Sequence, residues 1–173
     1  MTPPIKTGIL YGILLSILTI GLHFIYTSIA ENPYQPNWVS SLIWLSFLII
    51  VPTIAYRRYC AKFQPVPFSD LMIIAVCISL TVALSAGVEN YVLATYLEPN
   101  LLEKLMILAE ENWANQGYSE EVIAGQAEHY MYASASNWAL VGVQFVFIIT
   151  FIIATGMAFM TKLITRINNV HGD

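Results

Sequence analysis

The sequence predicts an all-α integral membrane protein, a four-helix bundle with an external helical hairpin between the third and fourth spans. Two observations predict this class. Of the 173 residues, 57% are hydrophobic and only 10% are charged, whereas soluble domains carry about 25% charged residues. Four apolar runs are each long enough to cross about 30 Å of hydrocarbon as a helix. Because lipid offers no partners to backbone N–H and C=O groups, such runs must be helical.

The four apolar runs make up a single membrane domain, residues 1–173. The predicted spans cover residues 8–30, 38–56, 68–92 and 138–160. The first run could instead be a signal peptide, because Ser28-Ile29-Ala30 resembles a cleavage site. Its apolar length exceeds the roughly 7–15 residues of a signal-peptide core, which favours an uncleaved span. Pro52 lies within the second run and removes one helical hydrogen bond there.

Basic residues orient the predicted bundle. Six of the seven lysines and arginines flank the spans on one face, and only Lys104 lies on the other. Since cytoplasmic loops are enriched in lysine and arginine, both termini should be cytoplasmic. Aromatic side chains near the span ends should anchor them at the lipid–water interface. These aromatic residues are Tyr34, Trp38, Tyr56, Tyr59, Phe63 and Trp138.

The external segment, residues 97–137, predicts two amphipathic helices joined by a turn. Pro99 suits a first helical turn, Gly117 a helix C-terminus and Ser119 an N-cap. We expect a hairpin that continues spans three and four outward, with its apolar faces packed together, although one helix could lie on the lipid surface instead. The segment carries seven of the eleven acidic residues, Glu98, Glu103, Glu110, Glu111, Glu120, Glu121 and Glu128.

The sequence contains no motif for catalysis or metal binding. The acids are spread along helices rather than gathered in a calcium loop, and HExxH, GxSxG and P-loop motifs are absent. Cys60 and Cys77 lack metal-ligand spacing, and no disulfide is expected between them. Asp70 and Ser69 suit a helix N-terminus, where both have structural explanations. We therefore predict a non-enzyme with no catalytic residue, metal, cofactor or nucleic-acid partner.

Small residues at four-residue intervals predict how two of the helices pack. The first span carries Gly8, Gly12 and Ser16, and the third carries Ala75, Ser79, Ala83 and Gly87. Such ridges let helix backbones approach closely, which is a main source of association between helices in lipid. We therefore expect spans one and three to contact each other along these ridges.

Four polar residues are predicted to gather in the outer half of the bundle, His23, Glu89, Asn90 and Gln144. A helical rise of about 1.5 Å per residue places them at similar depths. An ionisable residue at the membrane centre costs about 2.5–3.5 kcal/mol and often serves a function. Glu89 and His23 could form a proton-linked or ligand-binding pocket. Alternatively, Glu89 reaches the interface and bonds to a neighbouring helix, as a purely structural residue.

The inner loop, third span and external segment together resemble a catalogued family. The resemblance rests on Pro67-Phe68-Ser69, Tyr96-Leu97-Glu98-Pro99, the turn from Asn115 to Glu121, and a closing Met131. Over nearly the whole chain, this plan resembles the bacterial membrane proteins known as domain of unknown function 4199. The resemblance implies a four-span inner-membrane protein of Gram-negative bacteria, without an established activity or site residues.

Two functions are compatible with these observations. The first is a non-enzymatic scaffold or subunit that meets a protein partner, or further copies of itself, through the external acidic hairpin. The alternative is a small transporter or channel that uses the cluster around His23 and Glu89. Transport would require oligomerisation, because four spans enclose only a narrow path. The lipid bilayer is the expected surrounding in both cases.

Overall fold

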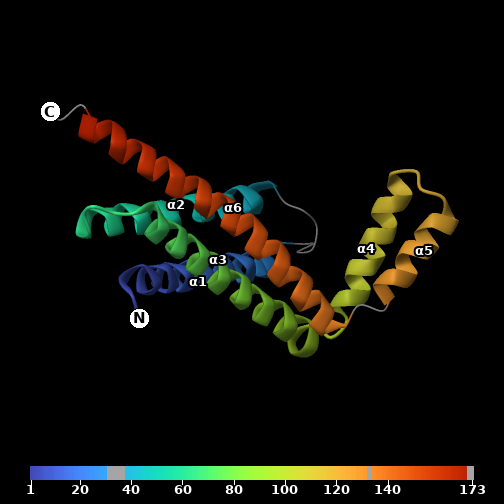
Figure 1. The fold of residues 1–173 in the computed structure, drawn as a ribbon. Coiled ribbons are helices and arrows are strands. Elements are labelled where there is room, and N and C mark those ends of the chain that lie inside the picture. The colour runs from blue at the N-terminus through green and yellow to red at the C-terminus, as the bar shows by residue number, and fades with distance from the viewer. Residues whose placement is uncertain (31–37, 132–133, 171–173) are drawn as a thin grey trace. The chain divides into compact units, whose positions relative to one another are not determined.

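The computed structural model describes residues 1–30, 38–131 and 134–170, and these form helices joined by short turns (Figure 1). No strand occurs within those ranges, which confirms the predicted all-α class. Four helices are long: α1 (Pro3–Ile29), α2 (Trp38–Lys62), α3 (Phe68–Val92) and α6 (Ala135–Val170). A π-helical turn, η1 (Leu93–Leu97), and two shorter helices, α4 (Leu101–Asn115) and α5 (Glu120–Met131), lie between α3 and α6.

The four long helices have the length and hydropathy of membrane spans, as predicted. The third begins and ends at the predicted residues, 68 and 92. Helices α2 and α6 continue past the predicted span ends, to Lys62 and Val170. Hydropathy marks only where apolar residues stop, and no glycine or proline follows in either extension to end the helix. The protein is a membrane protein with four spanning helices.

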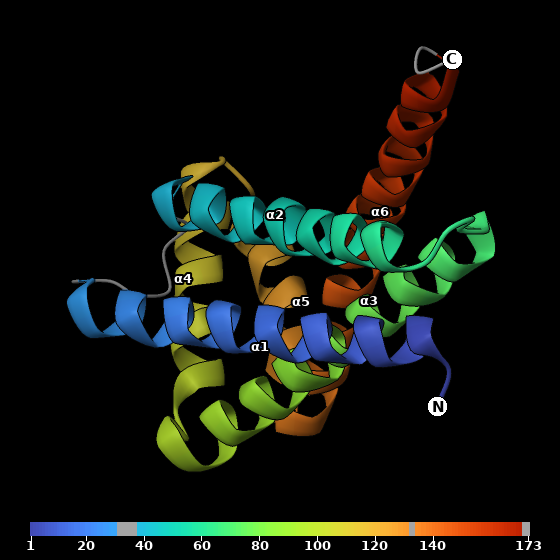
Figure 2. The ribbon, with the colours of Figure 1, turned by 90° about the vertical axis from the view of Figure 1, so that its left-hand side faces the viewer.

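The chain divides into two compact units. The bundle unit comprises Met1–Ala86 and Gln144–Asp173, and the hairpin unit comprises Gly87–Val143. Within the bundle unit, α1 and α2 lie side by side (Figure 2).

The bundle unit has an apolar core drawn from all four of its helices. Its largest fully buried apolar side chains are Leu15, Leu48, Tyr56, Leu71, Ile74 and Ile78, and Ala154 and Ala158 of α6 complete it. The opposite faces of the same helices carry exposed apolar side chains, including Leu10, Ile50, Leu80 and Ile152. An exposed apolar surface of this extent suits contact with lipid rather than water.

Helix α1 meets α3 through its glycines. A Cβ atom added to Gly12 would lie 2.6 Å from Thr81 Cβ, and one added to Gly8 would collide with Cys77 Cβ and lie 3.0 Å from the Ile74 carbonyl oxygen. The two backbones therefore approach as closely as glycine allows. However, the α3 residues opposite these glycines are not those of the predicted ridge.

The predicted ridge on α3 has a different environment. Ala75, Ser79 and Ala83 are fully buried. Gly87, the last member, lies in the hairpin unit, where an added Cβ would collide with Val143 of α6. At that end the ridge therefore faces α6 rather than α1. Four-residue spacing identifies a close-packed face but does not name the helix that covers it.

Hydroxyl groups on these faces bond within their own helices. Ser16 Oγ donates to the Gly12 carbonyl at 2.8 Å, and Thr19 Oγ1 donates to the Ser16 carbonyl at 3.0 Å. Ser79 Oγ donates to the Ala75 carbonyl at 2.8 Å, and Thr81 Oγ1 to the Cys77 carbonyl at 2.7 Å. In an apolar medium a backbone carbonyl one turn earlier is the nearest acceptor for serine and threonine.

The hairpin unit contains α4 and α5, which pack against each other as predicted. Gly117 ends the first helix with φ of 82°, a conformation that glycine adopts without the steric cost of a side chain. Ser119 directly precedes α5, whose first turn carries Glu120 and Glu121. The prediction that Pro99 lies in the first turn of the helix is wrong by two residues. It lies in the turn before α4, where the Leu101 N–H bonds to the Glu98 carbonyl at 2.9 Å.

Candidate functional site

Two buried tyrosines tie the end of α2 to other helices. Tyr56 is fully buried, and its hydroxyl donates to the Ala154 carbonyl of α6 at 2.9 Å. Tyr59 is 4% exposed, and its hydroxyl donates to Asp70 Oδ2 at the start of α3, at 2.7 Å. The prediction that both are interfacial anchors is therefore wrong. A buried phenol requires a hydrogen-bond partner, and the folded bundle supplies one to each.

The other predicted anchors have different outcomes. Trp38 is 75% exposed, as an anchor requires, and Trp138 is half-buried. Phe63 packs on Tyr59, with ring centroids 4.8 Å apart. Tyr34 lies outside the described residues.

A single lysine holds the loop between α2 and α3 against α6. Lys162 Nζ donates to the Val66 carbonyl oxygen at 2.7 Å. Val66 is only 8% exposed, and its side chain joins the apolar core. Its neighbours Pro65 and Pro67 have no backbone N–H to donate, and the loop is bonded here through the carbonyl oxygens of Val66 and Pro67. The Asp70 N–H bonds to the Pro67 carbonyl at 3.1 Å and completes the attachment to α3.

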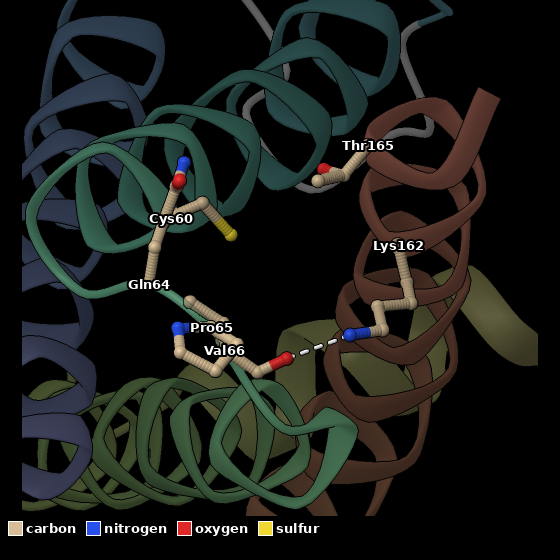
Figure 3. Close-up of a pocket in the computed structure, with 6 residues that line it drawn as sticks. All are labelled: Cys60, Gln64, Pro65, Val66, Lys162 and Thr165. Carbon is tan, nitrogen blue, oxygen red and sulfur yellow. Dashed lines mark hydrogen bonds between the residues drawn. The ribbon is translucent and has the colours of Figure 1, made fainter. Parts of the chain in front are cut away.

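A pocket of about 370 Å³ opens beside this lysine. We call it the basic-loop pocket, and it is lined by Cys60, Gln64, Pro65, Val66, Lys162 and Thr165. Figure 3 shows the sulfur of Cys60 and the ammonium group of Lys162 directed toward the space between α2 and α6. Cys60 is a free thiol. Pro65 and Val66 supply apolar walls, and the remaining residues supply polar groups.

The basic-loop pocket is cationic in character. A lysine ammonium has three N–H donors, and that of Lys162 makes its hydrogen bond to an uncharged carbonyl. Across residues 1–30, 38–131 and 134–165, no carboxylate forms an ion pair with Lys162. Among these described residues, two donors and a full positive charge of Lys162 therefore remain for a ligand. Thr165 Oγ1 donates to the Thr161 carbonyl at 2.9 Å, which leaves its oxygen as an acceptor.

The four residues of the predicted polar cluster fall into separate units. His23 is half-buried on α1 beside Phe24, and Gln144 is exposed on α6; both belong to the bundle unit. Glu89 and Asn90 are half-buried on α3 and belong to the hairpin unit. Within the hairpin unit Glu89 and Asn90 are adjacent in the chain, and the gathering of all four residues stays a prediction. The functional and structural interpretations of Glu89 and His23 both stay predictions.

Asn90 has a close neighbour in the hairpin unit. Its side-chain amide nitrogen occupies the place that a Cβ atom of Gly142 would take on α6. One turn earlier on α3, Gly87 accommodates Val143 of α6 in the same way. At this contact each helix has a glycine that accommodates a side chain of the other helix. Gly87 of α3 accommodates Val143, and Gly142 of α6 accommodates Asn90. This packing gives Asn90 a structural role.

The pocket residues were not predicted as a site. In the sequence the basic residues near the span ends serve only to orient the protein, and Pro67 only marks the inner loop of the family resemblance. One feature of the sequence could have indicated this site. Lys162 lies at the end of an apolar span and has no acidic residue close to it in the sequence. Within residues 138–172 there is no aspartate or glutamate to neutralise Lys162.

Comparison with protein families identifies the family of this chain. The model of the family described as "Protein of unknown function (DUF4199)" matches residues 6–165. The chain belongs to the DUF4199 family. No curated protein and no solved structure matches it.

The DUF4199 match includes the structural features described above. It begins at Lys6 in the first turns of α1 and ends at Thr165, which lines the basic-loop pocket. All six pocket residues and the whole α4–α5 hairpin therefore fall within the DUF4199 region. The family assigns no activity to either feature.

Proposed function

We propose that this DUF4199 protein is a non-enzymatic scaffold or subunit of the inner membrane that meets a protein partner through its α4–α5 hairpin. Both termini lie in the cytoplasm in this proposal, and the hairpin lies outside. The distribution of charge supports that orientation. The hairpin unit has one lysine, whereas the other six basic residues belong to the bundle unit, and cytoplasmic segments retain basic residues.

The observation that carries the proposal is the combination of strong negative charge and exposed apolar side chains on the hairpin unit. Residues 87–143 contain eight glutamates and one lysine, a formal charge of −7. Yet Ile107, Tyr118 and Val122 are 48%, 52% and 45% exposed. Aromatic and aliphatic side chains set among charged ones are typical of a surface that binds another protein.

A small groove near the turn of the hairpin gives this surface a shape. It measures about 180 Å³ and is lined by Trp113, Tyr118, Val122, Ile123 and Gln126. Glu120 and Glu121 flank it in the sequence and are exposed. The occupant that suits both features is a basic protein segment that places one apolar side chain in the groove. Opposite charges would speed its association and fix its orientation.

The test uses the full-length protein in its native membrane, with a photo-crosslinking amino acid at Tyr118 in the groove. The matched control carries the same amino acid at Ala124, which is exposed on α5 and, by helical periodicity, points away from Val122, Ile123 and Gln126. We expect one stoichiometric protein adduct from position 118 and none from 124. The adduct should weaken when Glu120 and Glu121 are both changed to glutamine.

Three outcomes contradict the proposal. Equal adducts from both positions would indicate random collision. An adduct of unchanged yield in the variant with Glu120→Gln and Glu121→Gln would show that these charges do not contribute to binding. An adduct between two copies of the chain would replace the basic partner with self-association.

A further inference from the structure

We propose that the basic-loop pocket binds the phosphate group of an anionic membrane lipid, with Lys162 as its charged contact. This site is separate from the hairpin, and the inference does not depend on the proposed partner. It rests on three properties of the pocket, namely its charge, its apolar surroundings and its size.

The charge of the pocket calls for an anion. The Lys162 ammonium group is held in place by a 2.7 Å hydrogen bond to the Val66 carbonyl. It is therefore preorganised, and ligand binding need not immobilise a free lysine side chain. Because its acceptor is neutral, the positive charge is not cancelled within the part of the chain that the structure describes. Ammonium groups bind phosphate as compact point charges.

The surroundings of the pocket favour a lipid over a small soluble anion. Lys162 and Thr165 stand at the end of the span Ala135–Thr165. Their neighbours Met160, Leu163 and Ile164 are 48%, 42% and 48% exposed on α6. A lipid bound through its phosphate at Lys162 would have an apolar helix surface beside it for its acyl chains. Basic pockets between membrane helices are a recognised means of binding lipid headgroups.

The size and the wall of the pocket also suit a headgroup. A volume of about 370 Å³ lies at the lower end of the roughly 300–1,000 Å³ typical of ligand sites. The Gln64 amide can donate a further hydrogen bond to a phosphate oxygen. Cys60 lies on the opposite wall, so a bound headgroup would cover its sulfur (Figure 3).

Because a bound headgroup would cover the Cys60 sulfur, the reactivity of Cys60 reports whether the pocket is occupied. The full-length protein carries Cys77→Ala, which keeps the Cβ atom that packs on Gly8 and leaves Cys60 as the only cysteine. The rate at which a maleimide alkylates Cys60 is measured in micelles that contain phosphatidylglycerol or phosphatidylcholine. Phosphatidylcholine has the same phosphate, but its trimethylammonium group cancels the charge and would be repelled by Lys162. We therefore expect phosphatidylglycerol to slow alkylation about tenfold relative to phosphatidylcholine, which corresponds to about 1.4 kcal/mol in binding.

Three substitutions locate the effect. Lys162→Gln should abolish the difference between the two lipids, and Lys162→Arg should retain it. Lys62→Gln is the matched control, because Lys62 is an exposed lysine at the end of α2 that contacts the Phe63 ring and does not line the pocket. It removes the same charge and should leave the difference intact.

A further variant covers the case in which Lys162→Gln does not fold. Thr165→Phe fills the pocket while leaving the bond from Lys162 to Val66 in place. It should abolish the preference for phosphatidylglycerol, and native mass spectrometry of the unmodified protein should show one retained phosphatidylglycerol.

The inference is overturned by any of three results. Equal alkylation rates in the two lipids would show that no anionic headgroup covers Cys60. Protection by inorganic phosphate alone, as strong as that by phosphatidylglycerol, would make the ligand a soluble anion. Loss of protection in Lys62→Gln equal to that in Lys162→Gln would assign the effect to the general charge of this face.

Discussion

The hydroxyl of Tyr56 donates a hydrogen bond to the backbone carbonyl of Ala154, 98 residues later in the chain, at 2.9 Å. This bond joins α2 to α6 inside the apolar core, where both residues are fully buried. The carbonyl lies within a continuous helix, so the tyrosine adds a second partner to a group that is already used by its own helix. The contact therefore adds stability to the bundle without being required for α6 to form.

Tyr56→Phe should destabilise the bundle by about 1 kcal/mol, because it removes one buried hydrogen bond and little volume. The thermal midpoint of the purified protein in one fixed detergent measures the effect. Tyr96→Phe is the control, since Tyr96 is 70% exposed and should tolerate the change. Equal midpoints for the two variants would contradict the assigned role of the Tyr56 hydroxyl.

Gly12→Ala should destabilise the protein by about 1–3 kcal/mol, the usual cost of overfilling a packed contact. The added methyl group would lie 2.6 Å from Thr81 Cβ. Gly21→Ala is the matched control on the same helix, where an added Cβ meets nothing within 4 Å. The double variant Gly12→Ala with Thr81→Gly should recover part of the loss in a double-mutant cycle. Strict additivity of the two substitutions would argue against this contact.

Asp70→Ala should destabilise the bundle by about 1.5–3 kcal/mol, because the buried Tyr59 hydroxyl loses a charged acceptor. Asp70→Asn retains an acceptor oxygen and should cost less. The unfolding midpoints of the two variants are compared, and the informative result is whether Asp70→Ala lowers the midpoint more than Asp70→Asn does. If Tyr59→Phe makes Asp70→Ala harmless, the loss belongs to this hydrogen bond; if it changes nothing, Asp70 acts mainly through the N-terminus of α3.

Gly117→Ala should loosen the α4–α5 hairpin by about 1 kcal/mol, since a φ of 82° is costly for a residue with a side chain. Hydrogen exchange of α4 and α5 should become faster while exchange in α1 stays the same. Gly125→Ala, where no neighbour lies within 4 Å of an added Cβ, should not accelerate exchange. Faster exchange in both variants would remove the special role of the turn.

The proposed orientation makes a prediction of its own. In a background of Cys60→Ser and Cys77→Ala, a cysteine at Tyr118 should react with a membrane-impermeant maleimide in intact spheroplasts. A cysteine at Ser69, which is exposed at the start of α3, should react only after lysis. The reverse pattern would place the hairpin in the cytoplasm and end the proposal of an external partner.

The sequence was sufficient to predict the spans because the signal for them is local. Long apolar runs need no knowledge of distant residues, and residues 68–92 were predicted without error. The turn at Gly117 could be predicted for the same reason. Pro99 was misplaced because proline suits both a first helical turn and the turn before a helix.

The basic-loop pocket depends on contacts that no local pattern reveals. Lys162 and Val66 are 96 residues apart, and either one alone suggests only a basic flank or an apolar loop. The same holds for Tyr56 and Tyr59, since an aromatic residue near the end of an apolar run suits an interface or a core equally well. Only the packing of α2 and α3 against α6 decides between the two.

The hydrogen bonds that hydroxyl groups of α1 and α3 donate to carbonyls of their own helices have a consequence for biogenesis. Ser16, Thr19, Ser79 and Thr81 each satisfy their donor on a carbonyl of their own helix, so these groups need no neighbour when a single helix enters the lipid. Insertion and assembly can therefore be successive events, and what joins α1 to α3 afterwards is the fit of a bare glycine backbone to the threonine and cysteine side chains opposite.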